Sequence, residues 1–294
     1  MNFTDKLIEK IIQTKNPSVV GLDPRYSFVP EYIKVKYKNE IDAIYEYNCG
    51  IIDAIEDLVP AVKPQLAFYE QYGSKGHELY EKTVKYAKSK GLLILADAKR
   101  GDIGSTAEAY SKAFFTGESQ ADAVTLNPYM GFDTINPFLE FGGKGAIVLV
   151  KTSNPSSIDL QNLIVEGRPL YEHFGEKLNE YGKKYLGENG YSRVLAVVGA
   201  TYPKEMKKLR EIMTGTYFLV PGYGAQGGTA EDVVEAFDDR GLGAIVNSSR
   251  GIIAAHKKCE LEDETKYTEC IRQAVISMRD EINDALTRAD KRYW

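Results

Sequence analysis

Eight short apolar runs recur along the chain, and longer stretches with apolar residues at helical spacing separate them. The runs are continuous rather than alternating, which is typical of strands buried on both faces of a parallel sheet. They are Ser18–Asp23, Pro60–Lys63, Leu92–Asp97, Ala121–Leu126, Gly145–Val150, Arg193–Val198, Tyr217–Val220 and Ala244–Asn247. Eight strand-then-helix units in about 250 residues favour a (β/α)8 TIM barrel over an open, doubly wound α/β sheet, which stays the alternative.

The helices between these strands are expected near residues 39–57, 69–90, 104–116, 131–141, 169–188, 203–213 and 229–239. One further helix is expected at 3–13, before the first strand, and a long one at 263–289, after the last. No linker rich in Pro, Ser or Gly and no block of like charge divides the chain. We therefore expect one catalytic barrel domain over residues 1–294, with extra helices at the termini.

Composition excludes several classes of protein. No run of roughly 18 apolar residues is present, and the N-terminal segment has charges among its apolar residues, so neither a membrane span nor a signal peptide is expected. Cys49, Cys259 and Cys270 form no CxxC pair and are odd in number, which favours free thiols in the cytoplasm. The net charge of −5 gives no general reason to bind nucleic acid, and three scattered histidines leave little for a metal site.

Polar and charged residues end most of the apolar runs. Asp23, Lys63, Asp97 and Asn247 each stand at the carboxyl end of one of them. In a barrel those ends meet at a single mouth, where (β/α)8 enzymes carry their chemistry. Because an unpaired buried charge costs several kcal/mol, the concentration of charges at this edge indicates a functional site.

The densest group of charges is Asp97, Lys99 and Asp102. Side chains alternate along a strand, so Asp97 and Lys99 should point the same way, and Asp102 follows in a turn that Gly101 permits. This spacing predicts a lysine held between two carboxylates. A buried ion-pair network with a purely structural role is the plainer interpretation, but it leaves Asp23 and Lys63 at the same mouth unexplained.

A glycine-rich loop follows the seventh run. The sequence PGYGAQGGT at 221–229 stands between a strand and a helix, and Arg250 follows the eighth run. Backbone N–H groups at such a loop and a guanidinium suited to bidentate contacts are a typical phosphate site, which in barrels lies after strands seven and eight. A flexible glycine turn is the alternative. After the fifth run, Thr152 and Ser153 offer hydroxyls that either bind a polar ring edge or turn the chain.

These segments together resemble one family. DAKRGDIGST at 97–106 looks like the DxKxxDI(xx)T signature of orotidine 5'-monophosphate decarboxylase. The family's other motifs follow in the expected order: GLDP at 21–24, VKPQ at 62–65, KTSNP at 151–155, PGYGAQGG at 221–228 and SSRGI at 248–252. The chain resembles the longer bacterial and protozoan type, with extra length near 25–40, 154–170 and 255–294.

The resemblance implies conversion of orotidine 5'-phosphate to uridine 5'-phosphate (UMP) and CO2, the last step of pyrimidine nucleotide synthesis, without a cofactor or metal. It implies that Lys99 donates a proton to C6 of the pyrimidine and that Asp97 lies beside the departing carboxylate. Asp102 and Thr106 would reach into the neighbouring subunit's site, which makes the enzyme a homodimer.

The remaining residues implied by the resemblance bind the nucleotide. Lys63 and Asp23 would hold the ribose, Lys63 extending the catalytic charge array. The other residues expected to bind the substrate are Thr152 and Ser153 at the pyrimidine edge, Pro221 beside the ring, and Gln226, Gly227, Ser249 and Arg250 toward the phosphate.

The charges at the predicted barrel mouth suit the decarboxylation that the resemblance implies. Loss of CO2 from C6 leaves a carbanion that the ring carbonyls stabilise little, so a cation near C6 has to stabilise the developing charge. Three alternatives stay open. They are a sugar-phosphate lyase or epimerase on a related barrel, a class I aldolase with Lys99 as Schiff base, and a non-catalytic nucleotide-phosphate sensor.

Overall fold

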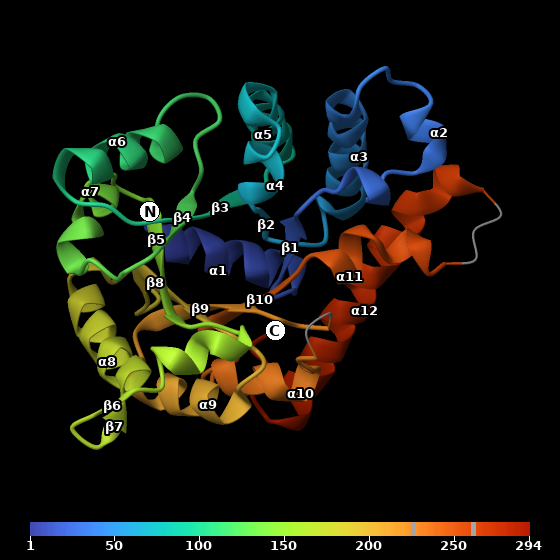
Figure 1. The fold of residues 1–294 in the computed structure, drawn as a ribbon. Helices are drawn as coiled ribbons and strands as arrows, with labels where there is room; N and C mark the ends of the chain where they lie inside the picture. Colours follow the sequence, from blue (N-terminus) through green and yellow to red (C-terminus); the bar gives the residue numbers. More distant parts are fainter. Residues whose placement is uncertain (225–226, 260–262) are drawn as a thin grey trace.

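The computed structural model describes residues 1–224, 227–259 and 263–294, and within them eight parallel strands close into a barrel (Figure 1). The barrel strands are β1 (Ser18–Leu22), β2 (Ala61–Pro64), β3 (Leu93–Arg100), β4 (Ala123–Leu126), β5 (Gly145–Lys151), β8 (Ser192–Val198), β9 (Thr216–Pro221) and β10 (Ala244–Ser248). Neighbours in the ring follow chain order, and β10 pairs with β1 to close it. All eight apolar runs are therefore strands, and the predicted (β/α)8 barrel is confirmed.

Two apolar layers explain why the runs are continuous. One set of strand side chains, including Leu95 and Leu219, fills the inside of the barrel together with α1 (Phe3–Thr14). The other set, including Ile94 and Val220, packs outward against the helices. Phe3 of α1 lies so close to Gly145 that any side chain there would meet the ring at 2.5 Å. Helix α1 thus closes the end of the barrel opposite the mouth.

The helices surround the strands (Figure 1). Those after α1 are α2 (Glu31–Lys34), α3 (Glu40–Ile55), α4 (Ala67–Glu70), α5 (Gly73–Ser89), α6 (Gly104–Phe115), α7 (Asn136–Leu139), α8 (Leu170–Gly182), α9 (Pro203–Ile212), α10 (Ala230–Val233), α11 (Arg250–Ile253) and α12 (Tyr267–Arg288). The C-terminal helix α12 packs on the barrel's own helices α3, α10 and α11. No helix in the described part of the chain is long and apolar enough to span a membrane.

Three predicted helices were wrong in extent. The helix expected at 69–90 breaks at Gly73, whose φ of 62° lies in the left-handed region. At 131–141 the structure has a 3-10 turn followed by the four residues of α7, because Gly131 turns the chain and Pro137 sits in the first turn of α7. At 229–239 only α10 and a 3-10 turn form, since the Asp238 carboxylate accepts backbone N–H bonds from Arg240 and Leu242 and turns the chain.

The extra length at 154–170 holds a small hairpin that the sequence analysis missed. Strands β6 (Ile164–Val165) and β7 (Arg168–Pro169) are antiparallel and are joined by Glu166 and Gly167, with φ of 48° and 81°. Two consecutive left-handed residues are what a two-residue hairpin turn requires. Strands of two residues are too short to produce an alternating pattern, which is why the sequence did not reveal them.

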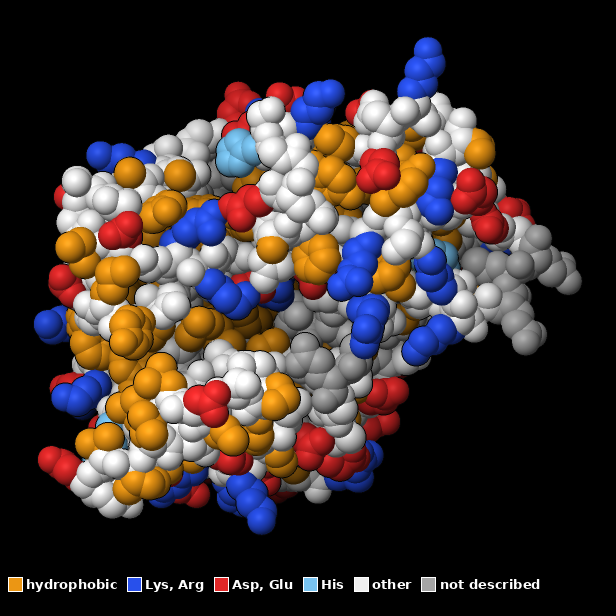
Figure 2. All heavy atoms as spheres, in the orientation of Figure 1, with side chains coloured by type: hydrophobic (Ala, Val, Ile, Leu, Met, Phe, Trp, Pro, Cys, Tyr) orange, Lys and Arg blue, Asp and Glu red, His pale blue; other side chains and the backbone are white. Residues whose placement is uncertain are grey.

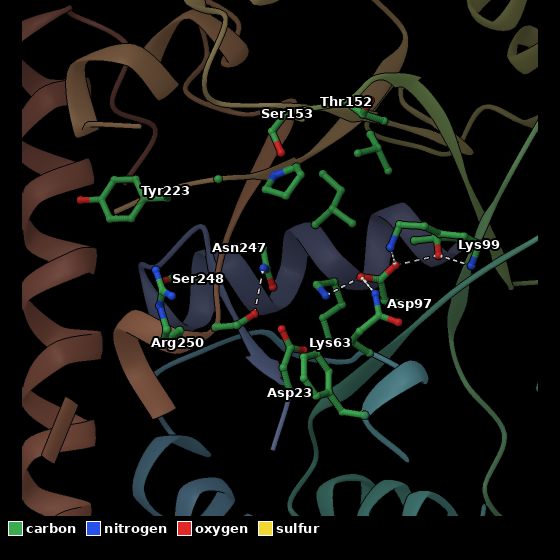
Figure 3. Close-up of a pocket in the computed structure, with 18 of the residues that line it drawn as sticks. Asp23, Lys63, Asp97, Lys99, Thr152, Ser153, Tyr223, Asn247, Ser248 and Arg250 are labelled. Atoms are coloured by element: carbon green, nitrogen blue, oxygen red, sulfur yellow. Dashed lines mark hydrogen bonds and ion pairs between the residues drawn. The ribbon is translucent and has the colours of Figure 1, made fainter. Parts of the chain in front are cut away.

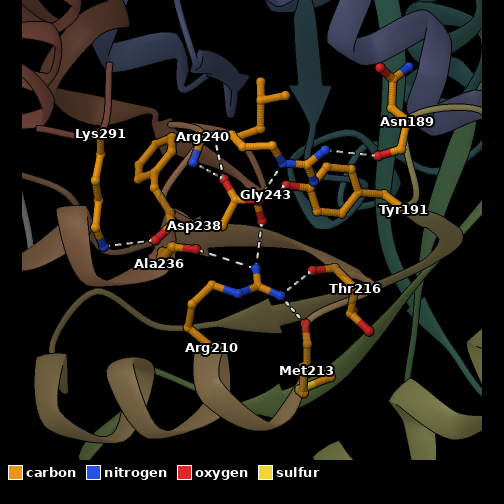
Figure 4. A network of polar contacts seen from close by, with 12 residues as sticks. Asn189, Tyr191, Arg210, Met213, Thr216, Ala236, Asp238, Arg240, Gly243 and Lys291 are labelled. Carbon is orange, nitrogen blue, oxygen red and sulfur yellow. Dashed lines mark hydrogen bonds and ion pairs between the residues drawn. The ribbon is translucent and has the colours of Figure 1, made fainter. Parts of the chain in front are cut away.

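At the end of the barrel opposite the mouth, a buried arginine joins several loops (Figure 4). The Arg210 guanidinium donates to the carbonyl oxygens of Thr216 at 2.9 Å, Gly243 at 3.1 Å and Ala236 at 3.4 Å, and also to that of Met213. Burial lowers the pKa of Arg210 to about 10, so it is still a cation at neutral pH. Arg210 lies on α9, and its hydrogen bonds to these carbonyl oxygens therefore fix the starts of β9 and β10 relative to that helix.

Beside Arg210, the Tyr191 hydroxyl donates to the Asp238 carboxylate, which also pairs with Arg240 at 3.0 Å. Lys291, after α12, donates to the Phe237 carbonyl at 3.0 Å and so attaches the C-terminal segment to the same end of the barrel (Figure 4). This network lies at the end of the barrel opposite the mouth and does not contribute to the site.

Candidate active site

A cavity of about 530 Å³ opens at the carboxyl ends of the barrel strands. Figure 2 shows a hollow near the middle of this face, with Lys and Arg side chains gathered around its rim. Nine of the residues predicted for the site line the cavity: Asp23, Lys63, Asp97, Lys99, Thr152, Ser153, Pro221, Ser249 and Arg250. Six strands or their following loops are needed to bring these residues together, and Figure 3 shows most of them around the cavity.

A lysine–aspartate–lysine array forms one wall of the cavity (Figure 3). The Asp97 carboxylate pairs with Lys63 Nζ at 2.7 Å through Oδ2 and with Lys99 Nζ at 2.5 Å through Oδ1. Lys63 and Asp97 are buried, whereas the Lys99 side chain is 45% exposed and faces the cavity. The array therefore places one accessible ammonium group beside a buried ion pair.

The charges of this array support one another. Burial alone would raise the pKa of Asp97, but Lys63 and Lys99 outweigh burial and hold it well below its usual value. Burial alone would lower the pKa of Lys63, and Asp97 together with Asp23 raises it above its usual value. Asp97 is thus a carboxylate and Lys63 an ammonium throughout the neutral range, and the cavity wall carries fixed charges of both signs.

Two neutral residues complete the surroundings of Asp97. The Thr125 hydroxyl on β4 donates to Asp97 Oδ1 at 3.0 Å, and the Gln65 amide donates to Oδ2 at 3.0 Å. Sequence reasoning left the role of Gln65 open and missed Thr125, because that threonine stands inside an apolar run. With four donors around it, the Asp97 carboxylate is held in one orientation.

The backbone at Lys99 is unusual. Its φ of 49° lies in the left-handed region, which a residue with a long side chain seldom adopts. The β3–β4 register shifts between Ala96 and Arg100, and Lys99 N–H donates to the Thr125 hydroxyl at 2.9 Å instead of to a strand carbonyl. Thr125 therefore holds both the Asp97 carboxylate and the strained backbone that directs the lysine into the cavity.

The opposite end of the cavity is built from β9, β10 and their loops. Gly222 and Gly224, with φ of 103° and 67°, turn the chain after β9, and Ser248 ends β10 while Ser249 and Arg250 follow it. A side chain at Gly21 would meet the Ser249 hydroxyl oxygen at 1.8 Å, so the glycine of GLDP makes room for Ser249. The predicted residue Gln226 lies outside the described residues.

Hydroxyl and amide groups after β5 form a third wall. Thr152 N–H donates to Gln161 Oε1 at 2.9 Å, and the Gln161 amide donates back to the Thr152 hydroxyl at 2.8 Å. Below them the buried Lys151 donates to Ser157 at 2.9 Å and to Asn162 at 2.8 Å. The extra residues after β5 thus act as a support that holds Thr152 and Ser153 toward the cavity.

Three of the predicted site residues are described but lie outside this cavity. Gly227 faces a second cavity behind the loop that joins β9 to α10, residues 222–229, called the β9 loop below. Asp102 and Thr106 lie beyond β3, where Thr106 is exposed and Asp102 accepts the N–H of Ile103 at 2.8 Å. Within one chain, therefore, Asp102 does not flank Lys99 as the spacing of the two residues suggested.

The cavity also has lining residues to which sequence reasoning gave no binding role: Arg25, Phe28, Phe68, Asn154, Tyr223, Ser248 and Asn247, the last noted only as the end of a strand. Most of them stand one to five residues past the end of a strand, and this position was the signal that could have identified them. Among the residues that the structure describes, no three His, Cys, Asp or Glu side chains come together as a metal site.

A closed parallel barrel with fixed charges at its mouth, and with a glycine loop and an arginine after its last two strands, defines a (β/α)8-barrel enzyme of the kind that binds phosphorylated ligands. The chain belongs to the orotidine 5'-phosphate decarboxylase / HUMPS family, whose model matches residues 18–261. The family resemblance predicted from the motifs is thus confirmed.

Individual proteins agree with this assignment. An orotidine 5'-phosphate decarboxylase of Clostridium perfringens (strain 13 / Type A) is 47% identical over 291 residues, which cover 97% of this chain and 100% of that protein. The crystal structure of a Toxoplasma gondii protein superimposes with a TM-score of 0.85 at 31% identity and covers 99% of both chains. An OMP decarboxylase of Leishmania donovani superimposes with a TM-score of 0.78 at 31% identity and covers 97% of this chain and 98% of that one.

Proposed function

We propose that this chain decarboxylates orotidine 5'-phosphate to UMP and CO2, the last step of pyrimidine nucleotide synthesis. The observation that carries the proposal is the Lys63–Asp97–Lys99 array, which faces the same cavity as Arg250 in a chain of this family. The array supplies charge where a carboxylate leaves and a carbanion forms, and Arg250 supplies a cation for the phosphate.

The cavity orients the nucleotide between these two ends. The phosphate lies toward Arg250, Ser249 and the start of the loop after β9, and Asp23 and Lys63 hold the ribose hydroxyls. Thr152 and Ser153 hydrogen-bond the pyrimidine edge, and Pro221 borders the ring. This orientation places C6 and its carboxylate beside Asp97 and Lys99.

The reaction breaks the bond between C6 and the carboxylate carbon. The electron pair stays on C6 as CO2 leaves, and Lys99 then transfers a proton from its ammonium group to C6, which gives UMP. The fixed Asp97 carboxylate disfavours the bound substrate carboxylate, and the Lys99 cation favours the carbanion. These side chains perform the reaction without a cofactor.

The direct test is a spectrophotometric assay with enzyme that has been treated with a chelator and freed of metal. We expect the orotidine 5'-phosphate absorbance to disappear and UMP to form in equimolar amount with CO2. A requirement for a divalent metal, with activity on a sugar phosphate instead, would identify the lyase or epimerase of a related barrel. Inactivation by borohydride in the presence of substrate would identify the Schiff-base aldolase.

A second prediction concerns the phosphate. Arg250→Ala is expected to weaken binding of orotidine 5'-phosphate and to lower its turnover, by several kcal/mol in total, because binding energy from a remote group contributes to the transition state. The phosphate-free nucleoside orotidine should lose much less. Steady-state kinetics on both substrates checks this, and equal losses on the two would mean that Arg250 does not bind the phosphate.

The assembly belongs to the same proposal. Asp102 and Thr106 complete the site of a neighbouring subunit, and the enzyme is a homodimer. Support comes from the surface around Asp102, where Ile103, Tyr129 and Met130 expose 57%, 81% and 52% of their area on the adjacent β3 and β4 loops. Exposed large apolar side chains that gather in this way are typical of a protein interface.

The chain acts as one catalytic barrel over residues 1–294, in the cytoplasm, with no nucleic acid or membrane partner. The free thiols of Cys49, Cys259 and Cys270 support this location, since disulfides are rare in that compartment.

A further inference from the structure

Tyr223 connects the cavity to the C-terminal helix. It follows Gly222 in the β9 loop, its side chain is buried, and its ring lines the cavity together with Ser248 and Arg250. Its hydroxyl donates to Oε2 of Glu281 on α12. Figure 3 shows the ring at the edge of the cavity with its hydroxyl oxygen directed away from Arg250, toward the long helix. Burial and then Glu281 raise the pKa of Tyr223, so the hydroxyl keeps the proton that it donates.

Tyr223 also stands where the two arms of the β9 loop meet. Tyr223 and Gly228 form a β-bridge, Gly224 N–H donates to the Gly228 carbonyl at 2.9 Å, and Gly228 N–H donates to the Gly222 carbonyl at 3.2 Å. A side chain at Gly228 would meet the Ala200 Cβ at 2.7 Å, so this base packs closely against the loop after β8. Fixing the position of Tyr223 therefore fixes the two paired ends of the loop, at 222–224 and at Gly228.

Helix α12 makes a second contact just past the loop. Arg288 pairs with Glu231 of α10, the helix that directly follows the loop, at 2.6 Å. Glu281 and Arg288 are seven residues apart and so lie on one face of α12, two turns from each other. Between these contacts lies a cavity of about 480 Å³, so α12 contacts the loop at Tyr223 and the helix after the loop at Glu231. The exposed Arg288–Glu231 pair is the weaker of the two, because solvent screens it.

We propose that Glu281 is a positioning residue for the phosphate end of the site. It touches no substrate in this arrangement and acts through the Tyr223 hydroxyl, which fixes the base of the β9 loop beside Arg250 before the substrate arrives. Ordering a mobile loop costs conformational entropy, and a loop that is already ordered binds its ligand with less loss. This inference rests on the proposed function for its substrate and gives the C-terminal helix a role in binding the phosphate.

The test compares Glu281→Gln and Tyr223→Phe on two substrates. We expect kcat/KM for orotidine 5'-phosphate to fall roughly fivefold to tenfold in each variant, because Tyr223→Phe removes the hydrogen bond and Glu281→Gln removes the charge of its acceptor. For orotidine, which has no phosphate, kcat/KM should change by less than about twofold on the same reasoning. The double variant should be no worse than Tyr223→Phe alone, because both substitutions act on the same contact.

Tyr191→Phe is the matched control. It removes a hydrogen bond between a tyrosine hydroxyl and a carboxylate, that of Asp238, at the opposite end of the barrel. This control should lower the melting temperature and leave kcat/KM for both substrates unchanged. Hydrogen–deuterium exchange of the free enzymes adds a readout that needs no substrate. Peptides spanning the β9 loop should exchange faster in Glu281→Gln and Tyr223→Phe than in the wild type or in Tyr191→Phe.

The outcomes test the positioning role of Glu281 separately from the proposed function. Equal losses of kcat/KM on orotidine 5'-phosphate and orotidine, or unchanged exchange in the β9 loop, would overturn the positioning role. If the wild-type enzyme is active on orotidine 5'-phosphate and Glu281→Gln is equally active, the proposed function stands and only the positioning role of Glu281 is refuted. A wild-type enzyme that is inactive on this substrate refutes the proposed function, and the exchange experiment still decides whether Glu281 orders the loop.

Discussion

Lys99→Ala is expected to abolish decarboxylation and to leave binding of UMP largely intact. General acid catalysis contributes about 10²–10⁴-fold, and a preorganised charge contributes about 10²–10³-fold, so losing both lowers turnover by at least about 10⁴-fold. Binding persists because the phosphate, ribose and pyrimidine contacts lie on other residues. Turnover is measured by loss of orotidine 5'-phosphate absorbance, and UMP affinity is measured by calorimetry.

The Lys99→Ala substitution is not expected to disturb the other charges of the site. Without Lys99, the Asp97 carboxylate keeps the Lys63 ammonium at 2.7 Å and the donors of Gln65 and Thr125, so no buried charge is left unpaired. The fold should therefore survive, which a melting curve checks. Lys99→Arg is the matched control, because a guanidinium keeps the positive charge but does not release a proton in this pH range.

Lys99→Arg separates the two roles of the lysine. If charge alone were sufficient, Lys99→Arg would recover much of the activity, whereas a need for proton donation leaves it far below the wild type. A Lys99→Ala enzyme that retains even a tenth of normal turnover would show that Lys99 is not the acid and that the mechanism is wrong.

The fold was predictable because burial on both faces leaves a simple mark on a strand. Runs such as Gly145–Val150 and Arg193–Val198 have no polar alternation, and eight of them at regular spacing leave few topologies. The short helices α7 and α10 were not predictable from the same pattern. Their ends depend on the backbone angle of Gly131 and on the local turn that the Asp238 carboxylate makes, which the spacing of apolar residues does not report.

The site was predictable where charges end a strand, as with Lys63, Asp97 and Lys99. It was not predictable where a role depends on the register between strands. Thr125 reaches Asp97 and the backbone of Lys99 only because β4 lies beside β3 at that height, and its own run reads as apolar. The left-handed backbone of Lys99 likewise follows from neighbouring strands and not from its local sequence.

Asp102 should serve the site of a partner subunit, and mixing two inactive variants tests this. Within one chain Asp102 lies outside the cavity, although it follows Lys99 by three residues. The turn that carries it packs against the β4 loop, since a side chain at Gly101 would meet the Asn127 carbonyl oxygen at 2.7 Å. Asp102 is thereby held near the exposed Ile103 and Tyr129, where the partner is proposed to bind.

Lys99→Ala and Asp102→Ala are each expected to be inactive as homodimers. After subunit exchange, a heterodimer holds one site with both defects and one site with neither, so it regains up to about half of the wild-type activity per dimer. An equal mixture at full exchange contains about half heterodimers and should therefore reach about a quarter of the wild-type activity, from the same two-site symmetry. Native mass spectrometry counts the heterodimers, and each variant incubated alone under the same conditions is the control. Heterodimers that are confirmed by mass and stay inactive would mean that Asp102 serves its own subunit, and the shared site would have to be abandoned.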